Sequence, residues 1–532
     1  MNLLERFERY VKKLYGQIRD LENKLTQTEE QLEKAEAEIR RLKKLPKKPD
    51  IKASELDKPK PDSSGKSGKT GKRPGSDKES KKKDLKIHET KVVEAEDVPS
   101  DWEFVGYQDY VIQDFVIRAN NIAYQREVWK SPDGQRKLVA TLPAHLINKH
   151  FGTTLQGYIL QQYYECGVTQ PLIRRSLLDF GVSISMGQIN NILIENKETF
   201  HQEKESLLAQ AIELKEELRT DDTLARHRFK NGSCNCINSD LFTYFTTTYS
   251  KSRINFLRIL RMEHEDYVLN QTALDYAIAQ ELPQKYYLVL SESYQNDEHH
   301  FADEAALNAY FNKHRITAVH AVRTIREALL MGAIVEHGFD PQTLIHSDGA
   351  RQFAVFVHSL CWKHAERPLV KLKPYDERQA QLLETKKEAF WTLYQALKKY
   401  KQAPDKALIP ILEQQFDQLC ESVDGFDSLN QVLQALKKKK DKLLLVLKRP
   451  RASLHNNDSE RDIREYAKRR KISAGTRSEN GKKARDTFLS LKKTCRKLGI
   501  SFWEYLIDRL NHDKQIPPLS QMMAHKARTA NG

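Results

Sequence analysis

The chain is short of cysteine, of acidic charge and of long apolar runs, and each shortage excludes a class of protein. Six cysteines among 532 residues are too few for a disulfide framework and indicate reduced thiols. Apolar runs such as Leu443–Leu447 are far too short to cross a bilayer, and the first residues lack the apolar core of a signal peptide. We therefore expect a cytoplasmic protein of bacterial type with no membrane partner.

The charge balance favours a polyanionic partner. Lys and Arg number 88 against 73 Asp and Glu, which gives a formal net charge of +15. Nucleic acid is the commonest partner of so basic a chain, and nucleoid association is expected. The hydrophobic content of 39% is lower than a single compact domain needs, so part of the chain must stay unburied.

The first 95 residues predict two extended segments. Residues 1–45 carry apolar side chains in alternating steps of three and four from Leu4 to Leu42, which predicts a coiled coil (a leucine zipper) joining copies into a homo-oligomer. The alternative is a long amphipathic helix packed on its own chain. Residues 46–95 are rich in Lys, Ser, Gly and Pro and predict a disordered basic linker that contacts phosphates without specificity.

Two small modules are predicted next. Residues 96–150 alternate in a strand-like way, as in Tyr107–Phe115, around a turn at Ser131–Gly134, and predict a small β-rich module. Residues 151–205 change to helical spacing, with a break at Phe180–Val182 and a new helix starting from Ser183–Ser185. This order predicts a helix-turn-helix-like DNA-binding region, with an ordinary helical hairpin as the alternative.

Three acidic residues stand out beyond that region: Asp221, Asp348 and Glu460. The two aspartates look like the ends of short strands that run into turns, and the glutamate looks like part of the first turn of a helix. Such carboxylates can converge on a pair of divalent cations, which clamp the attacking and leaving oxygens of a phosphodiester. In so basic a chain this pattern points to the cutting and joining of DNA.

The surrounding pattern predicts a ribonuclease H-like α/β catalytic core. After Asp221, a hairpin turn is expected at Lys230–Gly232, and Leu241–Tyr249 and Ile254–Leu260 are rich in strand-forming residues. A helix over 321–330 then leads to a strand that ends at Asp348. Three strands, a helix and a further strand is the order in which that fold begins.

The remaining boundaries complete an α+β multidomain protein. The first part of the core spans 214–368, and a helical insertion over 369–450 separates it from the last part, 451–515, which holds the glutamate helix. Residues 516–532 form a tail. Asn457 or Asp458 is expected to cap the glutamate helix.

Basic residues follow Glu460 along its helix and beyond it, and phosphate contacts made by such residues position DNA without reading its sequence. The predicted DNA-binding residues are Arg461, Arg464, Lys468, Arg469, Arg470, Lys471 and Arg477. Asp222, Thr223 and His364 are candidates for supporting the carboxylates. A packed, purely structural histidine is the alternative for His364.

A zinc site is a weaker interpretation of the cysteines. Cys234-x-Cys236 and Cys361-x-x-His364 offer four ligand types. The two pairs lie far apart in the sequence, and inert buried thiols are the alternative that we favour.

The chain resembles the IS66 family of insertion-sequence transposases, a DDE group. The resemblance rests on Thr220–Thr223, Ser347–Gly349, Cys361–Arg367 and His455–Leu506, and it extends over the zipper-like start and the linker. It implies that Asp221, Asp348 and Glu460 bind two Mg²⁺ or Mn²⁺ ions and catalyse DNA cleavage and strand transfer at terminal inverted repeats and target DNA. It also implies small accessory proteins of the same element.

Two points limit the resemblance. Relatives carry a cysteine-rich zinc-binding segment before the helical region, and residues 90–150 contain no cysteine. A catalytically inactive, transposase-derived DNA-binding or regulatory protein is the alternative, and a coiled-coil scaffold is a third. The sequence does not distinguish them.

Overall fold

The computed structural model describes residues 86–94, 96, 99, 102–142, 147, 150–296 and 298–531. The chain divides into two units, Met1–Val111 and Ile112–Gly532, and every helix and strand named below belongs to the second. The predicted coiled coil over 1–45 and most of the predicted linker over 46–95 lie outside the described residues.

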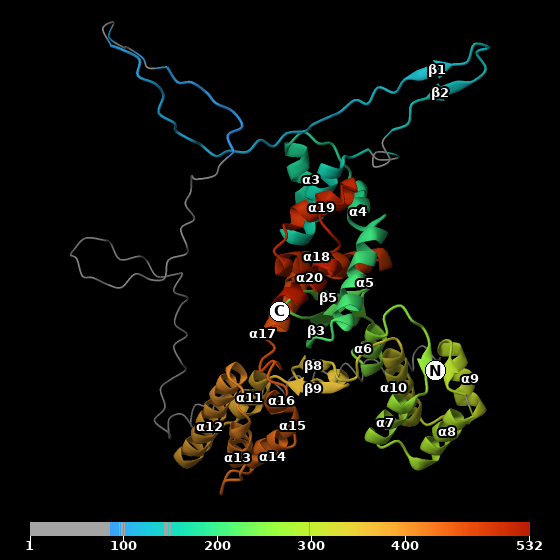
Figure 1. The fold of residues 1–532 in the computed structure, drawn as a ribbon, viewed down its shortest axis with the longest axis vertical. Helices are drawn as coiled ribbons and strands as arrows, with labels where there is room; N and C mark the ends of the chain where they lie inside the picture. Colours follow the sequence, from blue (N-terminus) through green and yellow to red (C-terminus); the bar gives the residue numbers. More distant parts are fainter. Residues whose placement is uncertain are drawn as a thin grey trace, which may run out of the picture. The chain divides into compact units, whose positions relative to one another are not determined.

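The stretch before the helices contains one small hairpin (Figure 1). Strands β1 (Val128–Lys130) and β2 (Lys137–Val139) pair antiparallel around the turn at Ser131–Gly134, as predicted. The strand expected at Tyr107–Phe115 does not form. Most of its apolar side chains remain on the surface, and Phe115 is 77% exposed, so within the described residues this segment pairs with no strand.

Helices then follow one another closely. These are α2 (Thr153–Leu160), which continues as the π-helical turn η3 (Gln161–Glu165), then α3 (Gln170–Asp179), α4 (Met186–Ile194) and α5 (Glu198–Glu213). The predicted pair of helices around Phe180–Val182 is α3 and α4. Gly181 has φ +82° at the turn, and the Ser185 hydroxyl accepts a hydrogen bond from the Gln188 amide at the start of α4.

A mixed five-stranded sheet follows in the order β5–β4–β3–β8–β9. Its strands are β3 (Leu218–His227), β4 (Lys230–Asn238), β5 (Thr243–Thr248), β8 (Leu344–Ser347) and β9 (Val357–Leu360). The first three are antiparallel neighbours, and β8 and β9 run parallel to β3. The predicted run of an acidic strand followed by two antiparallel partners is therefore present.

The β3–β4 turn differs from the prediction. His227 pairs with Lys230, so the turn residues are Arg228 and Phe229, both with positive φ, rather than an Asn-Gly pair. Gly232 instead lies within β4 against β5. A Cβ atom there would come within 2.4 Å of the Thr248 carbonyl oxygen, so this position needs glycine because the neighbouring backbone is so close.

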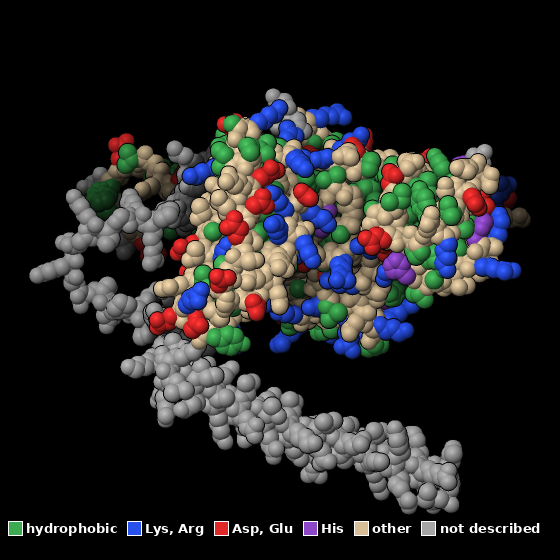
Figure 2. All heavy atoms as spheres, turned by 90° about the horizontal axis from the view of Figure 1, so that it is seen from below, with side chains coloured by type: hydrophobic (Ala, Val, Ile, Leu, Met, Phe, Trp, Pro, Cys, Tyr) green, Lys and Arg blue, Asp and Glu red, His purple; other side chains and the backbone are tan. Residues whose placement is uncertain are grey.

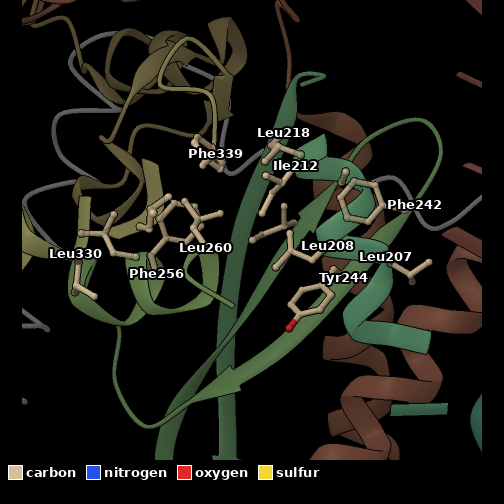
Figure 3. Close-up of a cluster of buried hydrophobic side chains, with 14 of the residues drawn as sticks. Leu207, Leu208, Ile212, Leu218, Phe242, Tyr244, Phe256, Leu260, Leu330 and Phe339 are labelled. Carbon is tan, nitrogen blue, oxygen red and sulfur yellow. The ribbon is translucent and has the colours of Figure 1, made fainter. Parts of the chain in front are cut away.

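A helical region separates β5 from β8. It comprises α6 (Arg253–Leu260), β6 (Tyr267–Val268), α7 (Gln271–Ala279), α8 (Gln284–Gln295), β7 (His300–Phe301), α9 (Glu304–Lys313) and α10 (Val319–Glu336). The strand predicted at Ile254–Leu260 was wrong. Ser252 caps a helix there, and Phe256, Leu257 and Leu260 repeat at helical spacing and pack toward Leu330 of α10 (Figure 3).

Helices also fill residues 369–450, as predicted, and the first of them begins a few residues earlier. They are α11 (Trp362–Lys371), α12 (Glu377–Gln402), the short η5 (Lys406–Leu408), α13 (Ile409–Leu419), α14 (Asp427–Lys437), α15 (Lys440–Leu443) and α16 (Leu445–Lys448). They share a hydrophobic cluster of their own around Trp362, Phe390 and Phe416.

The last helices are α17 (Asn457–Ser473), α18 (Glu479–Leu498), α19 (Phe502–Asn511) and α20 (Leu519–Asn531). Gly499, with φ +80°, ends α18. Side chains of α17 and α18 pack on one face of the sheet against Cys236 and Phe245. Those of α5 pack against Tyr244, Phe242 and Leu218 (Figure 3). None of the described helices is long and apolar enough to cross a membrane.

Candidate active site

Asp221 points toward the helix that carries Glu460. Strands alternate their side chains between the two faces of a sheet, and directly paired residues share a face. Asp221 pairs with Cys236, and Cys236 and Ala225 belong to the cluster that α17 and α18 cover. Asp221 therefore lies on the α17 face. It is the fourth residue of a ten-residue strand, not the strand end that the sequence suggested.

Asp348 comes level with Asp221 on the neighbouring strand. Leu218 pairs with Ile345 and Arg219 with His346 in the parallel β3–β8 ladder. The same offset, extended two residues to the position just after β8, would bring Asp348 opposite Asp221, and paired strands are about 4.8 Å apart. The charge of Asp348 acts on Asp221, as this closeness requires. Asp348 follows the last residue of β8, as predicted, and its Oδ1 accepts a hydrogen bond from the Ala350 amide at 2.9 Å.

Buried polar side chains fix the first turn of α17 on the sheet. Asn456 is fully buried, and its Nδ2 donates to the Thr220 carbonyl at 3.0 Å, next to Asp221. The Asn238 Nδ2 of β4 donates to the Ser459 hydroxyl at 2.9 Å. Glu460 follows in the first turn, as expected. The cap predicted at Asn457 or Asp458 was wrong: Asn456 is the N-cap, so the helix begins one residue earlier than an Asn457 cap would give. The Asn456 side chain makes no cap hydrogen bond, and its amide donates to the strand instead.

Burial and the two neighbouring carboxylates change the pKa of Asp221. Burial raises the pKa of Asp221 to about 7; a hydrogen bond from the Asp222 amide acts against this rise, and the negative charges of Asp348 and Glu460 add to it. Among the described residues, the sets whose ligand atoms all lie within 4.8 Å do not include this triad.

Asp222 and Thr223 take different places. Asp222 alternates to the other face, where its carboxylate pairs with Lys251 at 2.8 Å and accepts from Gln352 at 2.6 Å. Because Lys251 and Gln352 hold the Asp222 carboxylate on that face, Asp221 is the one of the two aspartates on the same side as Glu460. Thr223 pairs with Cys234 on the α17 face.

His364 lies beside Glu460, together with a residue that the sequence analysis missed. The His364 Nε2 is 3.7 Å from the Glu460 Oε1, and Arg367 Nη2 is also 3.7 Å from that oxygen. Arg464 contacts the other oxygen at 3.0 Å. Burial lowers the pKa of His364, so the ring is neutral at pH 7. Arg367 is three residues after His364 on α11, a spacing that places both on one helix face.

Comparisons with known proteins give the family. The family model described as "Transposase IS66 family" matches residues 299–484. The chain is also 41% identical over 313 residues to the "Uncharacterized protein y4jO" of Sinorhizobium fredii, across 58% of this chain and 97% of that relative. The chain belongs to the IS66 family of transposases. No solved structure matches it.

The family match covers two of the three carboxylates of this transposase. Asp348, Glu460 and the His364–Arg367 turn of α11 lie within residues 299–484, and Asp221 lies before them. The sheet register is therefore what connects Asp221 to the matched part of the chain.

Most of the basic residues predicted to bind DNA are on the surface. The side chains of Arg461 and Arg464 are 70% and 72% exposed, and Lys468, Lys471 and Arg477 are exposed as well. Arg470 is half-buried. Figure 2 shows Lys and Arg spread over much of the face that it draws, with Asp and Glu among them, so overall surface charge alone does not mark a path for DNA.

Arg469 differs from the other basic residues. It is 3% exposed, and its guanidinium lies 3.5 Å from the centroid of the Tyr163 ring. A buried cation over an aromatic face contributes to packing between α17 and η3. The DNA contact predicted for Arg469 therefore does not agree with its burial.

The cysteines of the weaker zinc interpretation do not gather. Cys234 and Cys236 are buried between the sheet and α17, and the Cys361 Sγ accepts a hydrogen bond from the Asn456 amide at 3.3 Å. Within the described part of the chain, no cysteine belongs to a set of three or more metal-ligand atoms.

Proposed function

We propose that this transposase is a DDE enzyme that cleaves DNA and transfers strands at the terminal inverted repeats of its insertion sequence. The observation that carries the proposal is the convergence of Asp221, Asp348 and Glu460 from two strands and one helix on the same side of the sheet. The strand order β5–β4–β3–β8–β9 supports a ribonuclease H-like core.

The donor set fits hard divalent cations. Three carboxylates supply oxygen ligands, which Mg²⁺ and Mn²⁺ prefer. Burial raises the pKa of Asp221 and repulsion from Asp348 and Glu460 adds to the rise; bound cations would relieve that repulsion. We propose that Asp221, Asp348 and Glu460 would together hold two such ions, since the charges of Asp348 and Glu460 both act on Asp221. When bound, such a pair activates the attacking hydroxyl and stabilises the leaving oxygen.

The chain's own residues orient this chemistry. In cleavage, water attacks a phosphodiester and a 3′-hydroxyl leaves; in strand transfer, that hydroxyl attacks the target phosphodiester and another 3′-hydroxyl leaves. Arg464 and Arg367 hold the Glu460 carboxylate through its two oxygens, and the His364 Nε2 lies 3.7 Å from the same carboxylate. We propose that the exposed basic residues Arg461 and Lys468 bind backbone phosphates.

Other parts of the chain are proposed to serve assembly and DNA binding. The helix pair α3–α4 is proposed as a helix-turn-helix-like DNA contact, supported by its capped second helix. The heptad pattern of residues 1–45 supports a homo-oligomer. Accessory proteins of the element and nucleoid association remain proposals from the resemblance and the net charge.

The test is a matched pair of variants on a supercoiled plasmid that carries both ends of the element. Asp348→Asn should bind DNA as the unchanged protein does and lose Mg²⁺-dependent nicking and strand transfer by at least a thousandfold. The control is Asp424→Asn, which alters an exposed carboxylate between α13 and α14. Full activity in Asp348→Asn would contradict the catalytic assignment. DNA binding without any cleavage by the unchanged protein would favour the regulatory alternative.

A further inference from the structure

A second group of metal-binding side chains lies on elements that carry none of the three carboxylates. His264 and Asp266 are in the loop between α6 and β6, and His337 is the C-cap of α10. One ligand atom from each of the three lies within 4.8 Å of the others. In the described part of the chain, this is the one set of three or more such atoms that comes so close together.

Two more observations extend the group. The His337 Nε2 is 2.8 Å from the Asp266 Oδ1, and the His300 Nε2 of β7 is 3.3 Å from the Asp266 Oδ2. The rings of His264 and His337 are stacked, with centroids 3.5 Å apart and planes 7° apart. Three imidazoles therefore surround one carboxylate, and each comes from a different segment of the chain.

The charges favour a cation at this point. An imidazole nitrogen that carries no proton offers a lone pair to a metal ion. The C-terminal end of α10, where His337 lies, carries the negative end of the helix dipole. The Asp266 carboxylate adds a negative charge.

The backbone that carries these residues is held in place. The buried Arg261 donates to the carbonyl oxygens of Glu265 and Asp266 at 2.9 and 2.6 Å. In the β6–β7 ladder, Val268 pairs with His300. The ligands therefore come from positions that main-chain contacts define, not from independent surface side chains.

We propose that His264, Asp266 and His337, with His300 as a fourth ligand, form a site for a divalent transition-metal ion such as Zn²⁺. Three imidazole nitrogens and one carboxylate oxygen are a donor set that zinc accepts in tetrahedral geometry. Neighbouring donors around such an ion are about 3.3 Å apart for bonds of roughly 2.0–2.1 Å. The distance between the His337 Nε2 and the Asp266 Oδ1, now 2.8 Å, must therefore increase slightly. The stacked rings of His264 and His337 must also tilt, because a bound ion lies in the plane of each imidazole ring.

The ion would act as a clamp between distant segments. It would join the loop after α6 to the end of α10, closing a loop of about 70 residues, and such closures give the larger stabilisations. The chain continues from His337 through the buried Phe339 into β8, which ends at Asp348. The clamp would thus stabilise the helical region that precedes the second aspartate, whether or not the proposed catalysis is correct.

The test is a Zn²⁺ titration of the full-length, metal-free protein in excess Mg²⁺, which occupies the carboxylate site. We compare the unchanged protein with His264→Ala and His337→Ala, and with the control His320→Ala, which removes an exposed histidine from the first turn of α10. Calorimetry gives affinity, and the visible spectrum of Co²⁺ bound in place of Zn²⁺ reports tetrahedral coordination. Circular dichroism without metal verifies folding.

The expected result is one high-affinity Zn²⁺ per chain, with affinity at least tenfold lower in both variants and unchanged in the control. His264 is exposed, so its replacement should fold normally even if His337→Ala does not. Zn²⁺ affinity that differs less than threefold between His264→Ala and the unchanged protein would overturn the proposal, as would the absence of binding at micromolar Zn²⁺.

Discussion

Replacing Asp221 with asparagine should stabilise the metal-free protein. Burial and the charges of Asp348 and Glu460 raise the pKa of Asp221 to about 7 in the folded chain, compared with roughly 3.9 for an unfolded aspartate. Between these values the folded state binds more protons than the unfolded state, so this residue's contribution to stability falls as the pH rises through the window. Above pH 7 the folded state carries the full cost of an ionised, crowded carboxylate.

The size of the cost follows from the pKa. The difference corresponds to roughly 4 kcal/mol at 1.36 kcal/mol for each tenfold change in proton affinity. Asp221 is only half-buried by its accessible surface, so solvent screens part of this energy. We expect Asp221→Asn to raise the free energy of unfolding by about 1–3 kcal/mol at pH 8 without metal. The gain should shrink as the pH falls toward 4.

Thermal unfolding at pH 5 and pH 8, with chelator or with Mg²⁺, measures both parts of this prediction. With chelator at pH 8 the variant should melt several degrees higher. Added Mg²⁺ should raise the melting temperature of the unchanged protein in a concentration-dependent way and leave that of the variant nearly unchanged. A variant that melts lower than the unchanged protein at pH 8, or gains as much from Mg²⁺, would refute the reasoning.

Further predictions concern the residues around the site. Protons compete with metal at Asp221, so the apparent Mg²⁺ affinity should fall about tenfold per pH unit below pH 7. The dependence of the cleavage rate on Mg²⁺ concentration measures this affinity. An affinity that does not change between pH 5 and pH 8 would contradict the prediction. Asn456→Ala removes the side-chain amide that donates to the Thr220 carbonyl, so it should lower the free energy of unfolding by about 1–3 kcal/mol, measured by urea unfolding. It should also reduce cleavage more than DNA binding, measured by plasmid nicking. Unchanged values of both would argue against a positioning role for Asn456. Arg461→Ala should lower DNA affinity uniformly across sequences and reduce the salt slope by about one, measured by fluorescence anisotropy, and an unchanged slope would exclude a phosphate contact.

Local patterns predicted the elements that carry the site. The motifs around Asp348 and Glu460 lie on short, self-contained structures, a strand end and a helical first turn, so the neighbouring residues suffice to find them. The helix that replaced the strand expected at Ile254–Leu260 shows the limit. The β-branched and aromatic residues of this segment are compatible with either a strand or a helix. The Ser252 cap and the packing against α10 favour the helix.

Long-range relationships could not be predicted from the sequence. The register that brings Asp221 level with Asp348 depends on a parallel pairing across more than a hundred residues. The role of Asn456 depends on a backbone carbonyl of a strand far away in the chain. The group formed by His264, Asp266 and His337 could not be found from local spacing, because helices α7 to α10 separate His337 from the other two.

The most direct test of the central claim is anomalous diffraction from crystals soaked in Mn²⁺. The account predicts two peaks about 4 Å apart, in contact with the carboxylates of Asp221, Asp348 and Glu460. Crystals that bind Mn²⁺ elsewhere, while these three carboxylates contact no ion, would contradict it.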